Sequence, residues 1–149
     1  MTTGQPVKFH GHPNPLLKHY VLNGGNPTAG VDFAEVPQYP AGIKPDADWE
    51  PAIFDFGSHV SANGSIQYKS NVFNGALKGK LVVCRYNVGS DLIFIGLGAD
   101  GNVNQVLVGL PGVTNLTNPL DLCEDTTNGN LYVSEYGLQA ITLLRPMGK

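Results

Sequence analysis

One stretch of sequence decides the fold class. Residues 80–86 are KLVVCRY, a strand pattern that is apolar on both faces. Residues 130–136 are NLYVSEY, and the two stretches align at an offset of 50 positions. In this alignment Leu81, Val83, Arg85 and Tyr86 coincide with Leu131, Val133, Glu135 and Tyr136. The chain therefore contains an internal repeat of short β-strands.

Further strand patterns flank both stretches. Around the first we expect strands at 65–70, 92–97 and 105–110, with a hairpin turn at 99–102. Around the second we expect strands at 119–124 and 140–144, with a turn at 125–129. A repeat of roughly 40–50 residues with four strands in each unit is typical of propeller blades. The sequence therefore predicts an all-β fold of propeller-like four-stranded antiparallel blades, one complete (61–112) and one partial (113–149).

The first part of the chain, residues 1–60, has a different character. It holds most of the prolines, and proline removes a strand donor and biases the preceding residue to extended conformations. We expect a long, irregular, packed segment here, with a short strand at Lys18–Leu22 and one helical turn at Asp46–Glu50. The predicted organisation is thus 1–60 irregular and 61–149 blades.

Composition excludes several functional classes. The chain has 149 residues with Lys+Arg 9 against Asp+Glu 12, and a pI near 5.7, which argues against a general nucleic-acid binder. No apolar run approaches the roughly 18 residues that a membrane span requires, so no membrane contact is expected. The first residues show no cationic region followed by an apolar one, so we expect no signal peptide.

The number of blades bears on assembly. Propellers close with about 4–8 blades, and each blade packs both faces against neighbours. Two blades alone would leave apolar faces in water. We therefore expect either a homo-oligomer or the remaining blades of a longer chain as the partner.

Several segments resemble one known family. They are GHPNP (11–15), VSANGSIQY (60–68), FNGALKGKLVV (73–83), NPLD (118–121) and GNLYVSEYG (129–137). Together they are similar to the C-terminal blades of soluble glucose/sorbosone dehydrogenase-like six-bladed β-propellers. The resemblance implies pyrroloquinoline quinone and Ca²⁺ as cofactors, and an extracellular or periplasmic location.

The sequence departs from that family where the cofactor binds. The family's quinone-contacting lysine has no counterpart in the matching stretch Cys84–Asn87. Its Arg-x-Arg-Asp segment corresponds to Asn118–Asp121, which keeps only the aspartate, and the blade with the catalytic histidine has no match in this chain. Two hypotheses follow. The first is a non-catalytic, self-associating propeller module with a carbohydrate-binding or assembly surface. The alternative is the C-terminal part of a quinone-dependent sugar dehydrogenase, an oxidoreductase active only with its remaining blades.

A few polar residues are candidates for a site. Arg85 and Glu135 occupy equivalent positions on apolar strands, where a charge needs a partner. They predict either an ion pair between the blades or a polar site for a carbohydrate. The further residues of that site would be Asn87, Asp121 and Tyr136.

Histidines and cysteines provide two more candidate features. His10 and His12 are two residues apart, so they can lie on one side of a strand and bind a metal, or they can be solvated loop residues. Cys84 and Cys123 are expected to be two buried thiols, with a disulfide between the blades as the alternative.

Overall fold

The computed structural model describes residues 52–57 and 59–147. The chain divides into two units, Met1–Ser58 and His59–Lys149. In the described part of the first unit, the rings of Phe54 and Phe56 meet edge to face with their centroids 4.8 Å apart. The strand predicted at 18–22 and the helical turn predicted at 46–50 lie outside the described residues.

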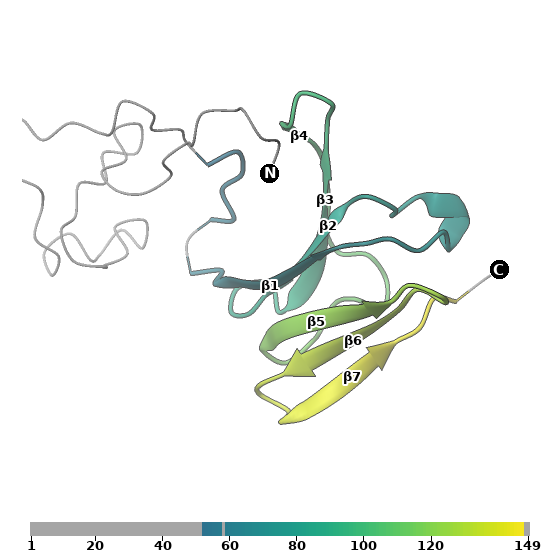
Figure 1. Ribbon diagram of the computed structural model, residues 1–149. Coiled ribbons are helices and arrows are strands. Elements are labelled where there is room, and N and C mark those ends of the chain that lie inside the picture. The colour runs from purple at the N-terminus through teal and green to yellow at the C-terminus, as the bar shows by residue number, and fades with distance from the viewer. Residues whose placement is uncertain (1–51, 58, 148–149) are drawn as a thin grey trace, which may run out of the picture. The chain divides into compact units, whose positions relative to one another are not determined.

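The second unit consists of two antiparallel sheets (Figure 1). The first has the order β1-β2-β3-β4, with the bounds β1 Ala62–Gln67, β2 Leu81–Arg85, β3 Asp91–Leu97 and β4 Val103–Leu107. The second has the order β5-β6-β7, with the bounds β5 Pro119–Asp125, β6 Asn130–Glu135 and β7 Ala140–Leu144. The all-β prediction of one four-stranded and one partial blade-like sheet is confirmed, and the two sheets form no closed propeller.

The central strands of the first sheet are buried on both faces. In β2, Val82 and Cys84 are fully buried on one face, and Val83 is buried on the other. In β3, the run from Asp91 to Gly96 is buried at every position. Such two-sided burial explains why these strands are continuous apolar runs, because alternation with polar residues arises only when one face meets water.

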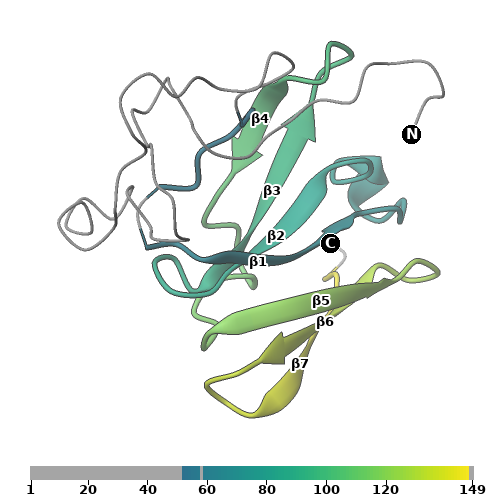
Figure 2. The same cartoon turned by 60° about the vertical axis from the view of Figure 1, so that its left-hand side comes forward.

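The main core lies between the two sheets. The four-stranded sheet contributes Val82, Cys84, Leu92 and Phe94, and the three-stranded sheet contributes Leu122, Leu131 and Val133. The first strands of the two sheets, β1 and β5, pack against each other and lie side by side in Figures 1 and 2. From this line the sheets spread apart toward β4 and β7. Each fully buried aliphatic side chain of this kind contributes about 1.5–3 kcal/mol to folding.

The internal repeat extends to the backbone of both sheets. Ser61 precedes β1 and Asn118 precedes β5, and both have a left-handed φ, 51° and 53°. The carbonyl of Ser61 accepts a hydrogen bond from the N–H of Tyr86, and that of Asn118 accepts one from the N–H of Tyr136. Left-handed residues are uncommon outside glycine, so their recurrence at matching places identifies the two sheets as copies of one structural unit.

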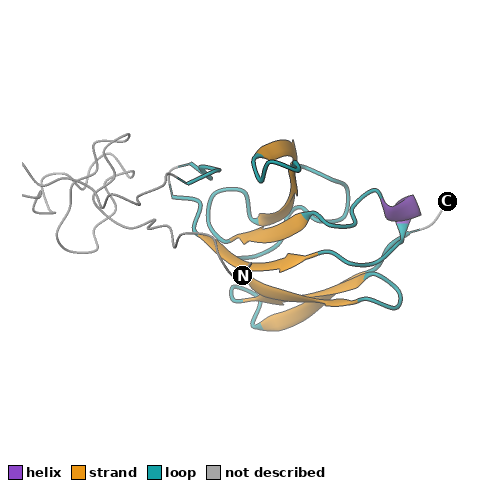
Figure 3. Ribbon diagram, turned by 45° about the horizontal axis from the view of Figure 1, so that its top comes forward, coloured by secondary structure: helices purple, strands orange, loops and turns teal. Residues whose placement is uncertain are grey.

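The connection from β1 to β2 fastens the two sheets together. It contains the short 3₁₀ turn Phe73–Gly75, drawn as a helix in Figure 3. The buried Tyr68 hydroxyl donates a hydrogen bond of 2.9 Å to the carbonyl of Gly129 in the β5–β6 turn. The Glu124 carboxylate of β5 accepts the N–H groups of Lys69 and Ser70 at 2.8 and 2.7 Å. These hydrogen bonds connect one sheet to the other. Together with the apolar core, they fix the position of the two sheets relative to each other.

Gly129 is required at its position for two reasons. Its φ is +75°, a conformation that glycine adopts without steric cost. A Cβ atom there would also lie 2.5 Å from the Tyr68 hydroxyl oxygen. Over residues 52–57 and 59–147, no helix is long and apolar enough to cross a membrane.

Candidate functional site

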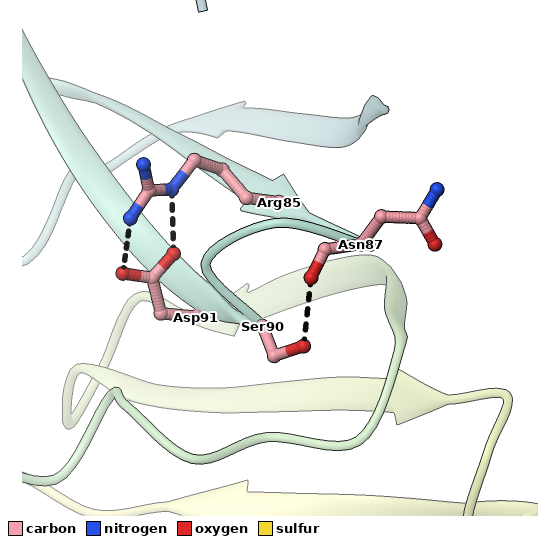
Figure 4. Close-up of polar contacts among 4 residues, drawn as sticks. All are labelled: Arg85, Asn87, Ser90 and Asp91. Carbon is pink, nitrogen blue, oxygen red and sulfur yellow. Dashed lines mark hydrogen bonds and ion pairs between the residues drawn. The ribbon is translucent and has the colours of Figure 1, made fainter. Parts of the chain in front are cut away.

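Arg85, at the end of β2, forms an ion pair within its own hairpin. Its Nε and Nη2 atoms each lie 2.6 Å from one oxygen of Asp91, the first residue of β3 (Figure 4). Asp91 is 3 % exposed, so this bidentate pair is largely removed from water. The hydrogen bonds to Asp91 raise the pKa of Arg85, which keeps the guanidinium charged.

Glu135, the counterpart of Arg85 in the second sheet, has different partners. Its side chain is buried, and one oxygen accepts the N–H of Thr117 while the other accepts the hydroxyl of Thr142 on β7. The predicted ion pair between Arg85 and Glu135 is therefore wrong. Each charged side chain has its partners close to its own hairpin. Arg85 and Asp91 lie directly opposite each other on β2 and β3, so their side chains meet within one sheet and neither has to extend to the other sheet.

The remaining predicted ligand residues do not surround these charges as one site. Asn87 lies exposed in the β2–β3 turn, where its carbonyl accepts the Ser90 hydroxyl at 3.0 Å (Figure 4). Asp121 is exposed on β5, and its Oδ1 accepts the N–H of the next residue, Leu122, at 2.8 Å. Tyr136 is 66 % exposed, and its ring centroid lies 6.2 Å from that of Tyr86. Of the predicted site residues, Glu135 and Tyr136 are the two that line one hollow together.

The metal prediction falls outside the described chain, since His10 and His12 belong to residues 1–51. Among the residues whose structure is described, no group of three or more His, Cys, Asp or Glu side chains could hold a metal ion.

The two cysteines are free thiols in different environments. Cys84 is fully buried between the sheets, and burial, with a smaller contribution from the charge of Asp121, raises the pKa of its thiol to about 12. Cys123 is exposed. The expectation of two buried thiols is thus correct for Cys84 and wrong for Cys123, because nothing among the described residues covers the side of β5 that carries Cys123.

That uncovered side is the most distinctive surface of the second unit. We define the outer face as the side of the β5–β7 sheet that carries Leu120, Asp121, Cys123, Tyr132, Ser134, Ile141 and Leu143. Ile141 is 72 % exposed, and Leu120 and Tyr132 are exposed as well. An open hollow of about 340 Å³ lies beside Tyr136 at one end of this face. It is lined by Leu120, Ser134, Glu135, Tyr136, Gln139, Ala140 and Ile141.

The repeat shows how unusual this exposure is. At the 50-residue offset, Tyr132 and Ser134 of β6 correspond to Val82 and Cys84 of β2. Both β2 residues are fully buried beneath the second sheet, whereas Tyr132 is exposed and Ser134 half-buried. The outer face therefore corresponds to a surface that the first sheet covers with a neighbour.

The outer edge of this sheet is also open. β3 pairs with β2 on one side and with β4 on the other. Its counterpart β7 pairs with β6, and no described strand lies beyond it (Figures 1 and 2). The sequence predicted that the second sheet lacks a fourth strand. It did not identify Leu120 or Ile141 as residues of an exposed surface. The signal was present, because both are apolar residues in the unit that lacks a neighbour.

Comparisons with known proteins add no relative. No protein-family model matches the chain, and no curated protein matches it either. The resemblance to quinone-dependent sugar dehydrogenases, with the quinone and Ca²⁺ that it implies, therefore stays a prediction from the sequence.

Proposed function

We propose that this chain is a non-catalytic, propeller-like module that associates with itself through its three-stranded sheet. The observation that carries the proposal is the contrast between equivalent elements. β3 has a neighbouring strand and a covered face, while β7 has an open edge and belongs to a sheet whose outer face is exposed. Unpaired strand edges and apolar sheet faces are the surfaces through which β-proteins associate.

The chemistry of this surface favours protein over carbohydrate as its occupant. A sugar site needs polar side chains that are free to bind hydroxyl groups. Arg85 is held by two hydrogen bonds in a bidentate pair with Asp91, and both oxygens of Glu135 already accept hydrogen bonds. The hollow combines the apolar Leu120, Ala140 and Ile141 with the polar Ser134, Tyr136 and Gln139. Beside it, the edge strand β7 offers backbone hydrogen bonds that a second strand would satisfy.

Hydrogen–deuterium exchange at increasing protein concentration tests the proposal. We expect the amides of β7 to exchange more slowly as the concentration rises, because association would pair the open edge. β4 is the internal control, since it is also an edge strand and should show no such change. Exchange at β7 that is independent of concentration, or protection that appears at β4 instead, would contradict the proposal.

A further inference from the structure

The edge strand β7 is suited to pairing with its own copy. We infer that β7 of one chain pairs antiparallel with β7 of a second chain, across a two-fold axis at Thr142, so that two three-stranded sheets join into one. This inference rests on the proposed function and specifies its partner and geometry. It follows from three properties of the edge: its regular register, its lack of charge and its position on the molecule.

The register of β7 sets it apart from the other edges. The two sheets have four edge strands, β1, β4, β5 and β7. The pairing of β1, β4 and β5 with their neighbours is interrupted by a register shift in each case. β7 pairs with β6 through five consecutive residues without a shift. Such irregularities protect an edge from pairing with another chain, and β7 lacks this protection.

The sequence of β7 is compatible with its own copy. The strand is AITLL, with no charged residue and no proline. In an antiparallel pair centred on Thr142, Ile141 of each chain lies opposite Leu143 of the other, and both belong to the outer face. Arg145 would lie opposite Gln139, so its charge does not meet its own copy. Symmetric pairing thus creates apolar cross-strand pairs and no like-charge contact.

The position of the edge limits the assembly to two copies. A ring or a fibre needs two different complementary surfaces on each chain. The face of the four-stranded sheet that a preceding blade would cover carries Val83, Ile93 and Ile95, and these are already buried in the single chain. The edge of β7 therefore meets its own equivalent, and a two-fold contact closes on itself after two copies.

Paired charge variants test this geometry. Ile141→Lys with Leu143→Lys puts two like-charged pairs across the axis, whereas Ile141→Lys with Leu143→Glu puts two opposite-charged pairs there. The two variants change the same positions and differ only in the sign of one charge. Val88→Lys with Val108→Lys is the control, because these two exposed residues lie outside β7 and its sheet. Circular dichroism verifies the fold, and analytical ultracentrifugation measures the dimer dissociation constant.

We expect the control to dimerise like the unmodified chain. The like-charged variant should dissociate at least about tenfold more readily, and the opposite-charged variant should recover most of that loss. If either double variant fails to fold, Ile141→Lys alone, at a position 72 % exposed, must still weaken the dimer. A dimer that responds equally to both charge patterns overturns the pairing at Thr142 but leaves self-association standing. A chain that is monomeric at every concentration overturns both proposals.

Discussion

At the residue scale, the bonds of Arg85 and Glu135 show how two charges are accommodated in an apolar unit. The charge of Arg85 is balanced by the buried carboxylate of Asp91. The carboxylate of Glu135 accepts hydrogen bonds from a backbone N–H and from a hydroxyl group. A buried charge without such partners would cost several kcal/mol. Both side chains thus have structural partners, and we assign their roles to the stability of the two hairpins.

Asp91→Ala tests the role of the ion pair. The substitution leaves the half-buried Arg85 guanidinium without its counter-charge, so we expect a loss of about 3 kcal/mol in the free energy of unfolding. Urea unfolding followed by circular dichroism measures it. Asp100→Ala is the control, because the Asp100 carboxylate accepts hydrogen bonds only from Asn102 in the same exposed turn, so its midpoint should move less than that of Asp91→Ala. Equal midpoints for the two variants would show that the pair contributes little.

The cysteines give a second residue-scale prediction. The thiolate is the reactive form, and the raised pKa of about 12 keeps buried Cys84 protonated. At about pH 8, Ellman's reagent should label Cys123 rapidly in the native chain and Cys84 only after unfolding. Labelling of both thiols at one rate in the native protein would contradict the burial of Cys84.

The same shift predicts a loss of stability at alkaline pH. The folded-state pKa of Cys84, about 12, exceeds its ordinary value of 9.0. The unfolded chain therefore loses this proton first, and the contribution of Cys84 is full below about pH 9 and declines as the pH rises toward 12. In Cys84→Ala the free energy of unfolding should fall less over that range than in the unmodified chain. A fall of the same size in both would show that other groups cause it.

At the element scale, the strands owe their positions to which faces are covered. Neighbouring residues of β6 have opposite environments, since Val133 is fully buried against the first sheet and Tyr132 is exposed. A strand with this alternation has only one register that keeps its apolar face in the core.

Val133→Asp and Tyr132→Asp form a matched pair that tests this alternation. The first places an unpaired carboxylate in the core, which costs several kcal/mol against a total stability of about 5–15 kcal/mol, so we expect no soluble folded chain. The second introduces the same carboxylate one position away on the outer face and should fold. Solubility and circular dichroism measure both. A folded Val133→Asp variant would exclude the packing of β6 against the four-stranded sheet.

The strands were predictable from the sequence because the spacing of the apolar residues along the chain indicates where strands lie. The partner of Arg85 was not, because it depends on the length of the β2–β3 turn, which aligns Asp91 with Arg85. An acidic residue at the start of an apolar strand was the available signal. The exposure of Cys123 likewise depends on what covers the second sheet, a tertiary fact that the local pattern of β5 does not contain.

At the scale of the whole molecule, the second unit is asymmetric. The central strands β2 and β3 of its four-stranded sheet are buried on both faces, whereas its three-stranded sheet has an exposed face and an edge strand with a regular register. Monomeric proteins protect such edges with charges, prolines or bulges. Because β7 has none of these, we expect a strand to cover it in solution, and a second β7 fits without a charge conflict.

The most direct test is the mass of the unmodified chain, measured by light scattering after size exclusion over a range of concentrations. We expect a dimer, twice the 15.9 kDa of one chain, with no growth to larger species at high concentration. A mass of 15.9 kDa at every concentration would contradict it, because the β7 edge would then remain open. A trimer or larger ring would also contradict it, because two-fold pairing of β7 ends at two copies.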